Sequence, residues 1–348
     1  MKKIRVMIVD DMLLFRTILS SVLIKDPSIE VVGAFGDPTE AIEKISELRP
    51  DVITVDMEMP KMRGDVFLGA MLSKYPHARA VVISSIGSNV FDAMQAGAID
   101  FVGKPGSSPG YEKEQFEKDV IEKVKIAASA DVQAHRRAVF SKVSVETATV
   151  KREPALCVNS KQLIAIGAST GGTEAILEVV RHFPAQAPGV VVVQHMPPGF
   201  TQMYAERADR VCKMSVREAK HGDRVEQGLM LIAPGGDRQL YVRRDSNGYF
   251  VSLKAESKVS GHCPSVDVLF SSVAETAGKN ATGVLLTGMG ADGAKGLQAM
   301  RKAGAHTVGQ DAQSSVVYGM PKVAFEIGAV AEQLPLSQIG QAVLKRFS

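Results

Sequence analysis

The segment LIAIGASTGGTEAILEVV, residues 163–180, joins an apolar strand pattern to a helical pattern through the turn GASTGG. Two kinds of chemistry fit such a turn. The N-terminus of a helix favours negative charge, so the turn could hold a phosphate group. Alternatively, residues 167–171 match the G-x-S-x-G pattern of a nucleophile elbow, in which small neighbours let the backbone turn sharply and expose the hydroxyl of Ser169.

The phosphate alternative has the weaker support. The turn lacks the lysine of a P-loop, and its glycines do not follow the G-x-G-x-x-G spacing of a dinucleotide site. The acidic residue expected about 20 positions further on is also missing, because the next apolar run ends in His195. A serine nucleophile needs a base and a group that orients the base. Whether the chain offers both residues therefore decides between the phosphate site and the nucleophile.

His195 ends the apolar run VVVVQH, which predicts a core strand whose carboxyl end meets the same sheet edge as Ser169. The position therefore favours His195 as the general base. The other histidines considered for this half lie on the following helix or in predicted loops, and rank below it: His182, His221 and His262.

The run TGVLLTGMGADGAKG repeats the design of a core strand followed by a glycine turn, and it carries Asp292. By itself Asp292 could equally be a helix N-cap. With Ser169 and His195 at the same edge, it is the predicted acid of a triad. Amide groups of Thr170 and Met289 are the candidate oxyanion donors. The chain order Ser, His, Asp differs from that of the α/β-hydrolases, so we expect convergent geometry on another fold.

Polar residues also follow the strand patterns of the N-terminal third. Asp10 and Asp11 end the first pattern, Asp56 ends the third, Ser84 ends the fourth and Lys104 follows the fifth. Singly, each aspartate could be a turn or cap residue. Together at one sheet edge, three carboxylates favour a divalent cation. The pattern predicts an Mg²⁺ site made by Asp10, Asp11 and Asp56, with Asp56 as phosphoryl acceptor and with Ser84 and Lys104 on the phosphoryl oxygens.

The elements that must position these residues follow from hydrophobic periodicity. Residues 4–130 alternate strand and helix patterns in five βα units, which predicts a flavodoxin-like, doubly wound parallel sheet. The predicted strands are residues 4–10, 31–36, 51–56, 78–84 and 98–103, and three of the helices are 41–48, 66–73 and 112–130.

The second half predicts another doubly wound, mostly parallel α/β domain. Its predicted strands are residues 163–168, 190–195, 229–234, 282–287 and 305–310, with a hairpin at 240–254 inserted in the sheet. Between the halves the chain is rich in Ser, Thr and charge without a sustained period. The predicted organisation is therefore a first domain of residues 1–125, a linker of 126–158 and a catalytic domain of 159–348.

Composition narrows the class of protein. The net charge of +3 is too small to indicate nucleic acid, and no nucleic-acid-binding motif is present. Cys157, Cys212 and Cys263 lack metal-ligand spacing, and their odd number argues against a disulfide framework. No apolar segment reaches the length of a membrane span. We expect a soluble, cytoplasmic, monomeric protein that is not membrane-inserted.

The motifs resemble those of the chemotaxis protein-glutamate methylesterases, the CheB family. VDD, DMEMPKMRG, SS and KP, within residues 3–125, resemble response-regulator receiver domains. GASTGGTEAI, QHMPPGFT, PSVDVLF, LTGMGADGA and SSVVYGMP look like the family's catalytic domain. Three departures stand out: Arg63 replaces a common acidic residue, Ala291 replaces a common Asn, and the segment 84–97 is a few residues short.

The resemblance implies a phosphorylation-controlled hydrolase. Its substrate would be a methylated glutamyl side chain on a chemoreceptor helix, with receptor glutamine deamidation as a side activity. A chemotaxis histidine kinase would phosphorylate Asp56, and Asp10 and Asp11 would hold Mg²⁺. The esterase chemistry would need no cofactor. Two other functions remain open from the residues alone: a non-enzymatic binding regulator, and an acylhydrolase for a small metabolite.

Overall fold

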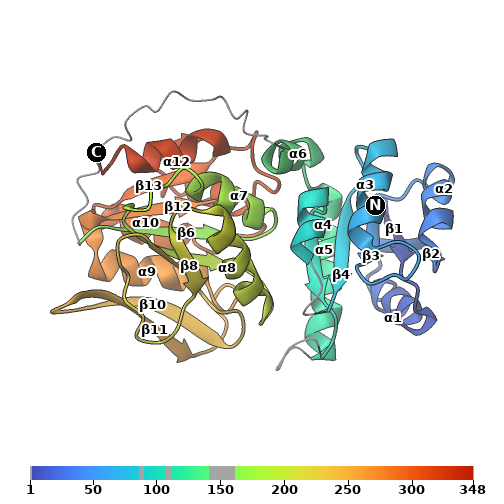
Figure 1. Ribbon diagram of the computed structural model, residues 1–348, viewed down its shortest axis with the longest axis horizontal. Coiled ribbons are helices and arrows are strands. Elements are labelled where there is room, and N and C mark those ends of the chain that lie inside the picture. Colours follow the sequence, from blue (N-terminus) through green and yellow to red (C-terminus); the bar gives the residue numbers. More distant parts are fainter. Residues whose placement is uncertain (1, 86–89, 107–111, 141–160, 348) are drawn as a thin grey trace. The chain divides into compact units, whose positions relative to one another are not determined.

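The computed structural model describes residues 2–85, 90–106, 112–140 and 161–347, and the chain forms two compact units, Met1–Val139 and Phe140–Ser348 (Figure 1). Both units are α/β folds built on parallel sheets, so the predicted fold class is confirmed. No helix among the described residues is long and apolar enough to cross a membrane.

The first unit is a five-stranded parallel sheet of order β2-β1-β3-β4-β5. Its strands are β1 (Ile4–Val9), β2 (Ile29–Phe35), β3 (Val52–Asp56), β4 (Ala80–Ser84) and β5 (Asp100–Gly103). Its helices are α1 (Leu13–Leu23), α2 (Pro38–Leu48), α3 (Gly64–Lys74), α4 (Val90–Ala96), α5 (Lys113–Ser129) and α6 (Val132–Phe140). α1 packs against α5, and α3 packs against α4. The right-handed crossovers expected between parallel strands would put these two pairs on opposite faces of the sheet.

Residues 126–129 and 132–140 are helical, so the predicted linker is wrong at its start. α5 continues to Ser129 and buries Ile126 and Ala127, and α6 buries Val132 and Ala134. Each helix has only a narrow apolar stripe among charged residues, which is why the composition resembles that of a linker. The rest of the predicted linker, residues 141–158, lies outside the described residues.

The second unit is a seven-stranded, wholly parallel sheet of order β14-β13-β12-β6-β7-β9-β8. Its strands are β6 (Leu163–Ala168), β7 (Gly189–Gln194), β8 (Ser215–Glu218), β9 (Leu229–Ile232), β12 (Ala281–Leu285), β13 (His306–Gln310) and β14 (Glu332–Leu334). Its helices are α7 (Gly172–Val180), α8 (Phe200–Val211), α9 (Val266–Thr276), α10 (Ala294–Lys302), α11 (Met320–Glu326) and α12 (Leu336–Leu344).

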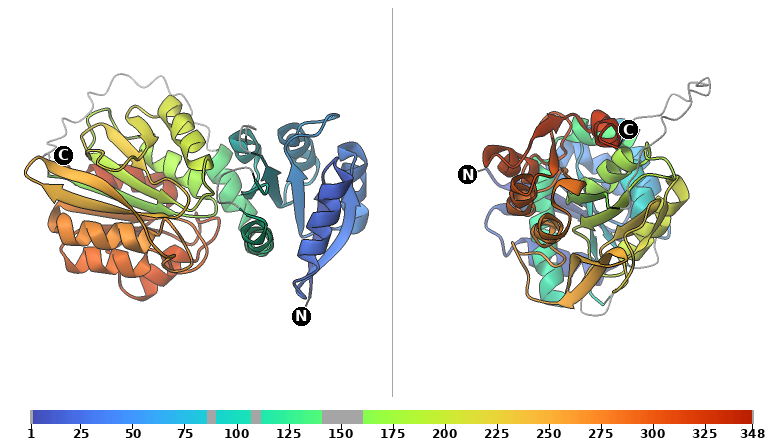
Figure 2. Two further views of the ribbon diagram at one scale, coloured as in Figure 1. Left: turned by 90° about the horizontal axis from the view of Figure 1, so that it is seen from below. Right: turned by 90° about the vertical axis from the view of Figure 1, so that its left-hand side faces the viewer.

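Two layers of helices cover this sheet (Figures 1 and 2). Side chains of β6, β7 and β9 form one continuous buried cluster with α9, α10 and α11. α7 and α12 pack against each other in the other layer. Because both faces are covered, the central strands β6, β7 and β12 are buried at every residue.

The hairpin is not inserted in the main sheet, contrary to the prediction. β10 (Arg238–Asp245) and β11 (Gly248–Ala255) form a separate two-stranded antiparallel sheet that packs on α9. Leu240, Val242 and Val251 of the hairpin join the buried cluster beneath it. An alternating strand pattern of this kind fixes one buried face, but it does not fix which layer the strand joins.

The strand order reverses between β6 and β12, and this switch point determines where a site forms. From β6 the chain proceeds to β7 on one side and returns through β12 to β13 on the other. Loops that leave two adjacent strands in opposite directions open a crevice at the carboxyl edge of the sheet. Ser169 follows β6 at this edge and Asp292 lies in the turn after β12.

Candidate active site

The turn after β6 carries Ser169 into the first turn of α7. Gly171 adopts a left-handed φ of 77° at the start of the helix. A side chain at Gly172 would place its Cβ 2.1 Å from Oε1 of Gln194, so only glycine fits this close approach. The glycines of the motif therefore serve the turn itself, as the elbow interpretation requires. Ser169 is 7% exposed.

Neighbouring strands hold the backbone of this turn on both sides. The N–H of Ser169 donates to the carbonyl of Thr287 at 3.0 Å, beyond the end of β12. On the other side, Nε2 of Gln194 donates to the carbonyls of Ser169 at 2.9 Å and His195 at 3.2 Å. One side-chain amide thus lies between the residue proposed as nucleophile and the residue proposed as base.

The carboxylate of Asp292 lies against the N-terminus of α9. Oδ1 accepts from Ser265 Oγ at 2.7 Å and from the N–H of Asp267 at 3.0 Å, and Oδ2 accepts from the N–H of Val266 at 2.8 Å. Burial alone would raise the pKa of Asp292, but the hydrogen bonds from His195 and this cradle hold it below its usual value. Asp292 is therefore an anion at neutral pH although it is 2% exposed.

His195 faces this anion through Nε2, at 2.8 Å from Asp292 Oδ2. Because an ionised carboxylate can only accept, Nε2 must carry a proton in this contact. Nδ1 is buried and has no hydrogen-bond partner among the described residues, which leaves its lone pair for another donor. Within the same residues, no hydrogen bond joins Ser169 Oγ to His195. The structure thus pairs His195 with Asp292 and leaves the contact with Ser169 unmade.

The ring of His262 stacks on the ring of His195, with centroids 3.7 Å apart and planes 10° from parallel. His262 comes from the loop after β11, which the sequence ranked below His195. His182 and His221, the other two histidines considered, bond to residues outside the triad. Nε of Arg181 donates to His182 Nε2 at 3.4 Å, and the N–H of Leu253 donates to His221 Nδ1 at 3.2 Å.

The candidate oxyanion donors lie at the switch point. Thr170 follows Ser169 and is 1% exposed. Its carbonyl accepts from Thr287 Oγ1 at 3.0 Å. The N–H of Met289, in the turn after β12, donates to no acceptor among the described residues. A free N–H near a nucleophile is what an oxyanion site needs.

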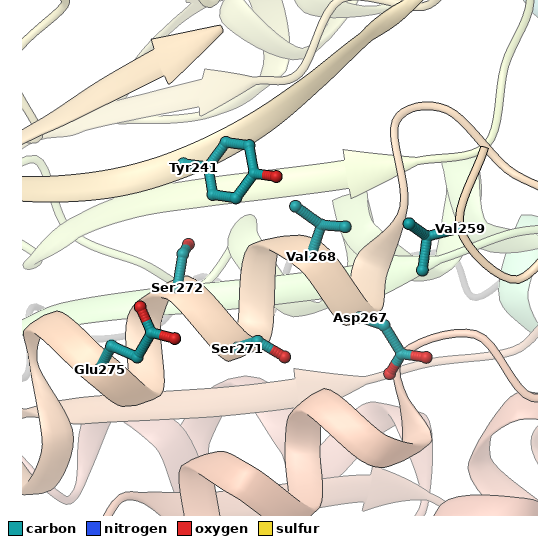
Figure 3. Close-up of a pocket in the computed structure, with 7 residues that line it drawn as sticks. All are labelled: Tyr241, Val259, Asp267, Val268, Ser271, Ser272 and Glu275. Carbon is teal, nitrogen blue, oxygen red and sulfur yellow. The ribbon is translucent and has the colours of Figure 1, made fainter. Parts of the chain in front are cut away.

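A pocket of about 200 Å³ lies between α9 and the hairpin, and none of the three triad residues lines it (Figure 3). Asp267 lies at its edge and links it to the triad, because the N–H of Asp267 donates to Asp292. Burial raises the pKa of Asp267 above its usual value. The remaining residues that line the pocket are Tyr241, Val259, Val268, Ser271, Ser272 and Glu275.

In the first unit, the predicted carboxylate cluster forms at the carboxyl edge of the sheet. One carboxylate oxygen each of Asp10, Asp11 and Asp56 lies within 4.8 Å of the others. Lys104 Nζ is 2.8 Å from Asp56 Oδ1 and 3.8 Å from Asp10 Oδ2. Ser84 is fully buried at the end of β4, and its Oγ donates to the carbonyl of Ser85 at 3.1 Å.

The charge balance of this cluster fits a divalent cation. Burial, followed by the charge of Asp56, raises the pKa of Asp10 to about 6. Asp10 Oδ2 and Asp11 Oδ1 are buried and accept no hydrogen bond within the described residues. Carboxylate oxygens without donors, gathered around one point, are the ligands that Mg²⁺ takes in proteins. Lys104 supplies one positive charge against three carboxylates.

Three neighbours of the site were missed by sequence reasoning: Gln194, Ser265 and Thr287. Each of them forms a hydrogen bond to a residue at least 25 positions away in the chain. Ser265 stands before a helical pattern and reads as an N-cap, a role that it also has through Val268 N–H. For Gln194, the only feature of the sequence that pointed to the site was its position directly before His195.

A carboxylate pocket in one unit and a Ser–His–Asp arrangement in the other are typical of a receiver joined to a hydrolase. Residues 164–343 match the family model described as CheB methylesterase, and residues 6–110 match the response regulator receiver domain. The chain belongs to the CheB methylesterase family.

Full-length relatives and a solved structure agree with this assignment. The chain is 49% identical to protein-glutamate methylesterase/protein-glutamine glutaminase 2 of Syntrophomonas wolfei, over 99% of this chain and 98% of the relative. It is 49% identical to the enzyme of that name from Sulfurimonas denitrificans, over 99% of each chain. The CheB methylesterase catalytic domain of Thermotoga maritima is 35% identical, with a TM-score of 0.52, and aligns with 53% of this chain and 98% of its own.

Proposed function

We propose that this chain is a protein-glutamate methylesterase and protein-glutamine glutaminase that acts on chemoreceptors under control of its receiver. The observation that carries the proposal is the pairing of His195 with Asp292 beside the Ser169 turn, in a chain that aligns from end to end with relatives of that name. The proposed nucleophile, base and acid are Ser169, His195 and Asp292.

In the proposed acylation step, His195 acts first as a general base and then as a general acid. Nδ1 of His195 takes the proton of Ser169 Oγ while Oγ forms a bond to the γ-carbonyl carbon of the glutamate ester. Asp292 accepts from Nε2–H and stabilises the imidazolium that forms. The carbonyl oxygen, now negative, accepts from the N–H groups of Thr170 and Met289. The bond to the methoxy group then breaks, and Nδ1–H protonates it to methanol.

Deacylation reverses the roles with water. His195 takes a proton from a water molecule, whose oxygen attacks the acyl carbon, and returns the proton to Ser169 Oγ as the glutamate leaves. A glutamine side chain passes through the same steps with ammonia as the leaving group. The proposed steps use only side chains and backbone amides of the second unit.

Control is assigned to the first unit. Asp56 is the proposed phosphoryl acceptor, and Asp10, Asp11 and Asp56 would hold Mg²⁺. The bound ion would neutralise charge on the phosphoryl oxygens. Lys104 already contacts Asp56 and would pair with a phosphoryl oxygen, and Ser84 would donate to another. The proposed phosphodonor is a chemotaxis histidine kinase. The cytoplasmic location and the monomeric state stay predictions.

The test is methanol release from methylated receptor membranes, measured with and without acetyl phosphate as phosphodonor. The proposal expects release that rises with the phosphodonor. A protein without activity toward any ester would instead be the binding regulator left open by the sequence. A protein that hydrolyses small esters but not methylated receptor would be the metabolite acylhydrolase.

A further inference from the structure

Gln194 is a buried polar residue with no role in the mechanism above. It ends β7 and is 3% exposed. Its Nε2 donates to two backbone carbonyls, those of Ser169 and His195. Its Oε1 is buried without a hydrogen-bond partner among the described residues, at the point that a Gly172 side chain would occupy. The amide orientation is fixed by its two acceptors, because only the NH₂ end can donate to them.

The carbonyl of Ser169 belongs to the same peptide unit as the N–H of Thr170. A trans peptide is planar, and its C=O and N–H point in opposite directions. A donor that holds the Ser169 carbonyl toward β7 therefore fixes the direction of the Thr170 N–H on the other side. A hydrogen bond to a carbonyl also polarises the N–H of its peptide unit and strengthens it as a donor.

We propose that Gln194 is a positioning residue for the oxyanion site: its amide orients the Ser169–Thr170 peptide so that the Thr170 N–H meets the developing oxyanion. The inference rests on the proposed function, because Thr170 is the candidate donor of that mechanism. The N–H of Gly172 also donates to the Ser169 carbonyl, at 2.7 Å. Removing Gln194 therefore loosens the peptide unit without leaving its carbonyl unpaired.

The test uses the full chain with acetyl phosphate and the variant Gln194→Met, which keeps the length of the side chain and removes the donor. We expect kcat for methanol release from methylated receptor to fall roughly 10- to 100-fold, as for a small misplacement of an oxyanion donor. KM should stay within about twofold, and the pH midpoint of kcat/KM should stay unchanged. Gln227→Met is the matched control, because it removes an amide-to-carbonyl bond to Gln186 before β9, away from the site.

A second readout does not depend on the receptor substrate. Sulfonylation of Ser169 by phenylmethanesulfonyl fluoride develops negative charge on a sulfonyl oxygen, so its rate should fall in parallel with kcat. If the wild type is sulfonylated but releases no methanol, the proposed substrate is wrong, and the sulfonylation rates still decide the role of Gln194.

Gly172→Ala reaches the same amide from the other side, with Gln194 unchanged. The new Cβ would lie 2.1 Å from Gln194 Oε1 and 2.6 Å from the Cβ of Ala168, so it should displace the amide and also press on the turn before Ser169. We expect a loss of kcat similar to that of Gln194→Met, and the losses of the two variants should be far from additive in the double variant.

The proposal is overturned if Gln194→Met keeps kcat and the sulfonylation rate within about twofold of wild type, or if it shifts the pH midpoint. A shift would mean that Gln194 acts through His195 instead.

Discussion

The orientation of His195 follows from what surrounds Asp292. Four donors converge on this carboxylate, from Ser265, from two N–H groups of α9 and from His195. The α9 N-terminus favours the anion, and the anion fixes the proton of His195 on Nε2. Nδ1 is then the nitrogen that we propose receives the Ser169 proton. This assigns the two ring nitrogens the opposite roles from those in the chymotrypsin-like template.

His195 and Asp292 should therefore act as one unit. We expect His195→Ala and Asp292→Ala each to lower kcat by at least roughly 10³-fold, and the double variant to lose little more than the worse single variant. Steady-state methanol release from methylated receptor measures all three. Losses that multiply would show that the two residues serve separate steps.

The parallel sheets account for how residues far apart in the chain reach one edge. In the first unit, Asp10, Asp56 and Lys104 come together although each lies at the carboxyl end of a different strand, β1, β3 or β5. The same rule brings Ser169 and His195 to the ends of the paired strands β6 and β7, where Ala168 lies opposite Gln194. The carboxyl ends of parallel strands are therefore the places in a sequence where site residues can be predicted.

Acetyl phosphate should label the first unit at Asp56. The reason is the cluster of three carboxylates with Lys104, which fits a cation and an incoming phosphoryl group. Labelling should require Mg²⁺, stop with EDTA and disappear in Asp56→Asn, as measured by intact-protein mass after a brief reaction. Undiminished labelling of Asp56→Asn would move the acceptor to another residue.

Asp267, at the start of α9, should make stability depend on pH. Burial raises its folded pKa above the unfolded value of 3.8, so the unfolded chain loses this proton first as pH rises. Its contribution to stability is then present below pH 3.8 and is lost as pH rises through the higher folded pKa. Thermal unfolding should show wild type losing stability relative to Asp267→Asn as pH rises above about 4. A difference that is constant or grows in favour of wild type would contradict this.

The strand ends of both sheets could be predicted because buried parallel strands are continuous apolar runs, as at Leu163–Ala168 and Gly189–Gln194. The edge strands β8 and β14 were missed, because four and three residues carry too little pattern. The cradle of Asp292 was missed for another reason. Ser265 meets Asp292 only through the packing of α9 beside the turn after β12, and no local pattern encodes that contact.

We predict that the first unit controls the second through a contact that forms and breaks. The sequence of residues 141–158, polar and without periodicity, is of a kind that transmits no force between domains. A phosphoryl group adds about two negative charges beside Lys104, and interfaces within a chain are moderate in size, so a switch of a few kcal/mol can shift them.

Removing residues 1 to about 150 should therefore raise activity on methylated receptor several-fold over the unphosphorylated full chain. The second unit is compact, and the Thermotoga maritima catalytic domain exists as a structure by itself, so the fragment should fold. Circular dichroism checks folding, and methanol release gives the rate. A folded fragment no faster than the full chain would rule out autoinhibition.

The most direct test of the central claim, that Ser169 carries an ester hydrolysis on receptor protein, is methanol release by Ser169→Ala. The full-length variant and the wild type are compared on receptor membranes methylated with a labelled methyl group, with acetyl phosphate present. The account predicts that wild type releases the label as methanol while the folded variant loses roughly 10⁴-fold or more of the rate. A variant that retains more than a few per cent of wild-type release would contradict it, and would assign the nucleophile to another residue.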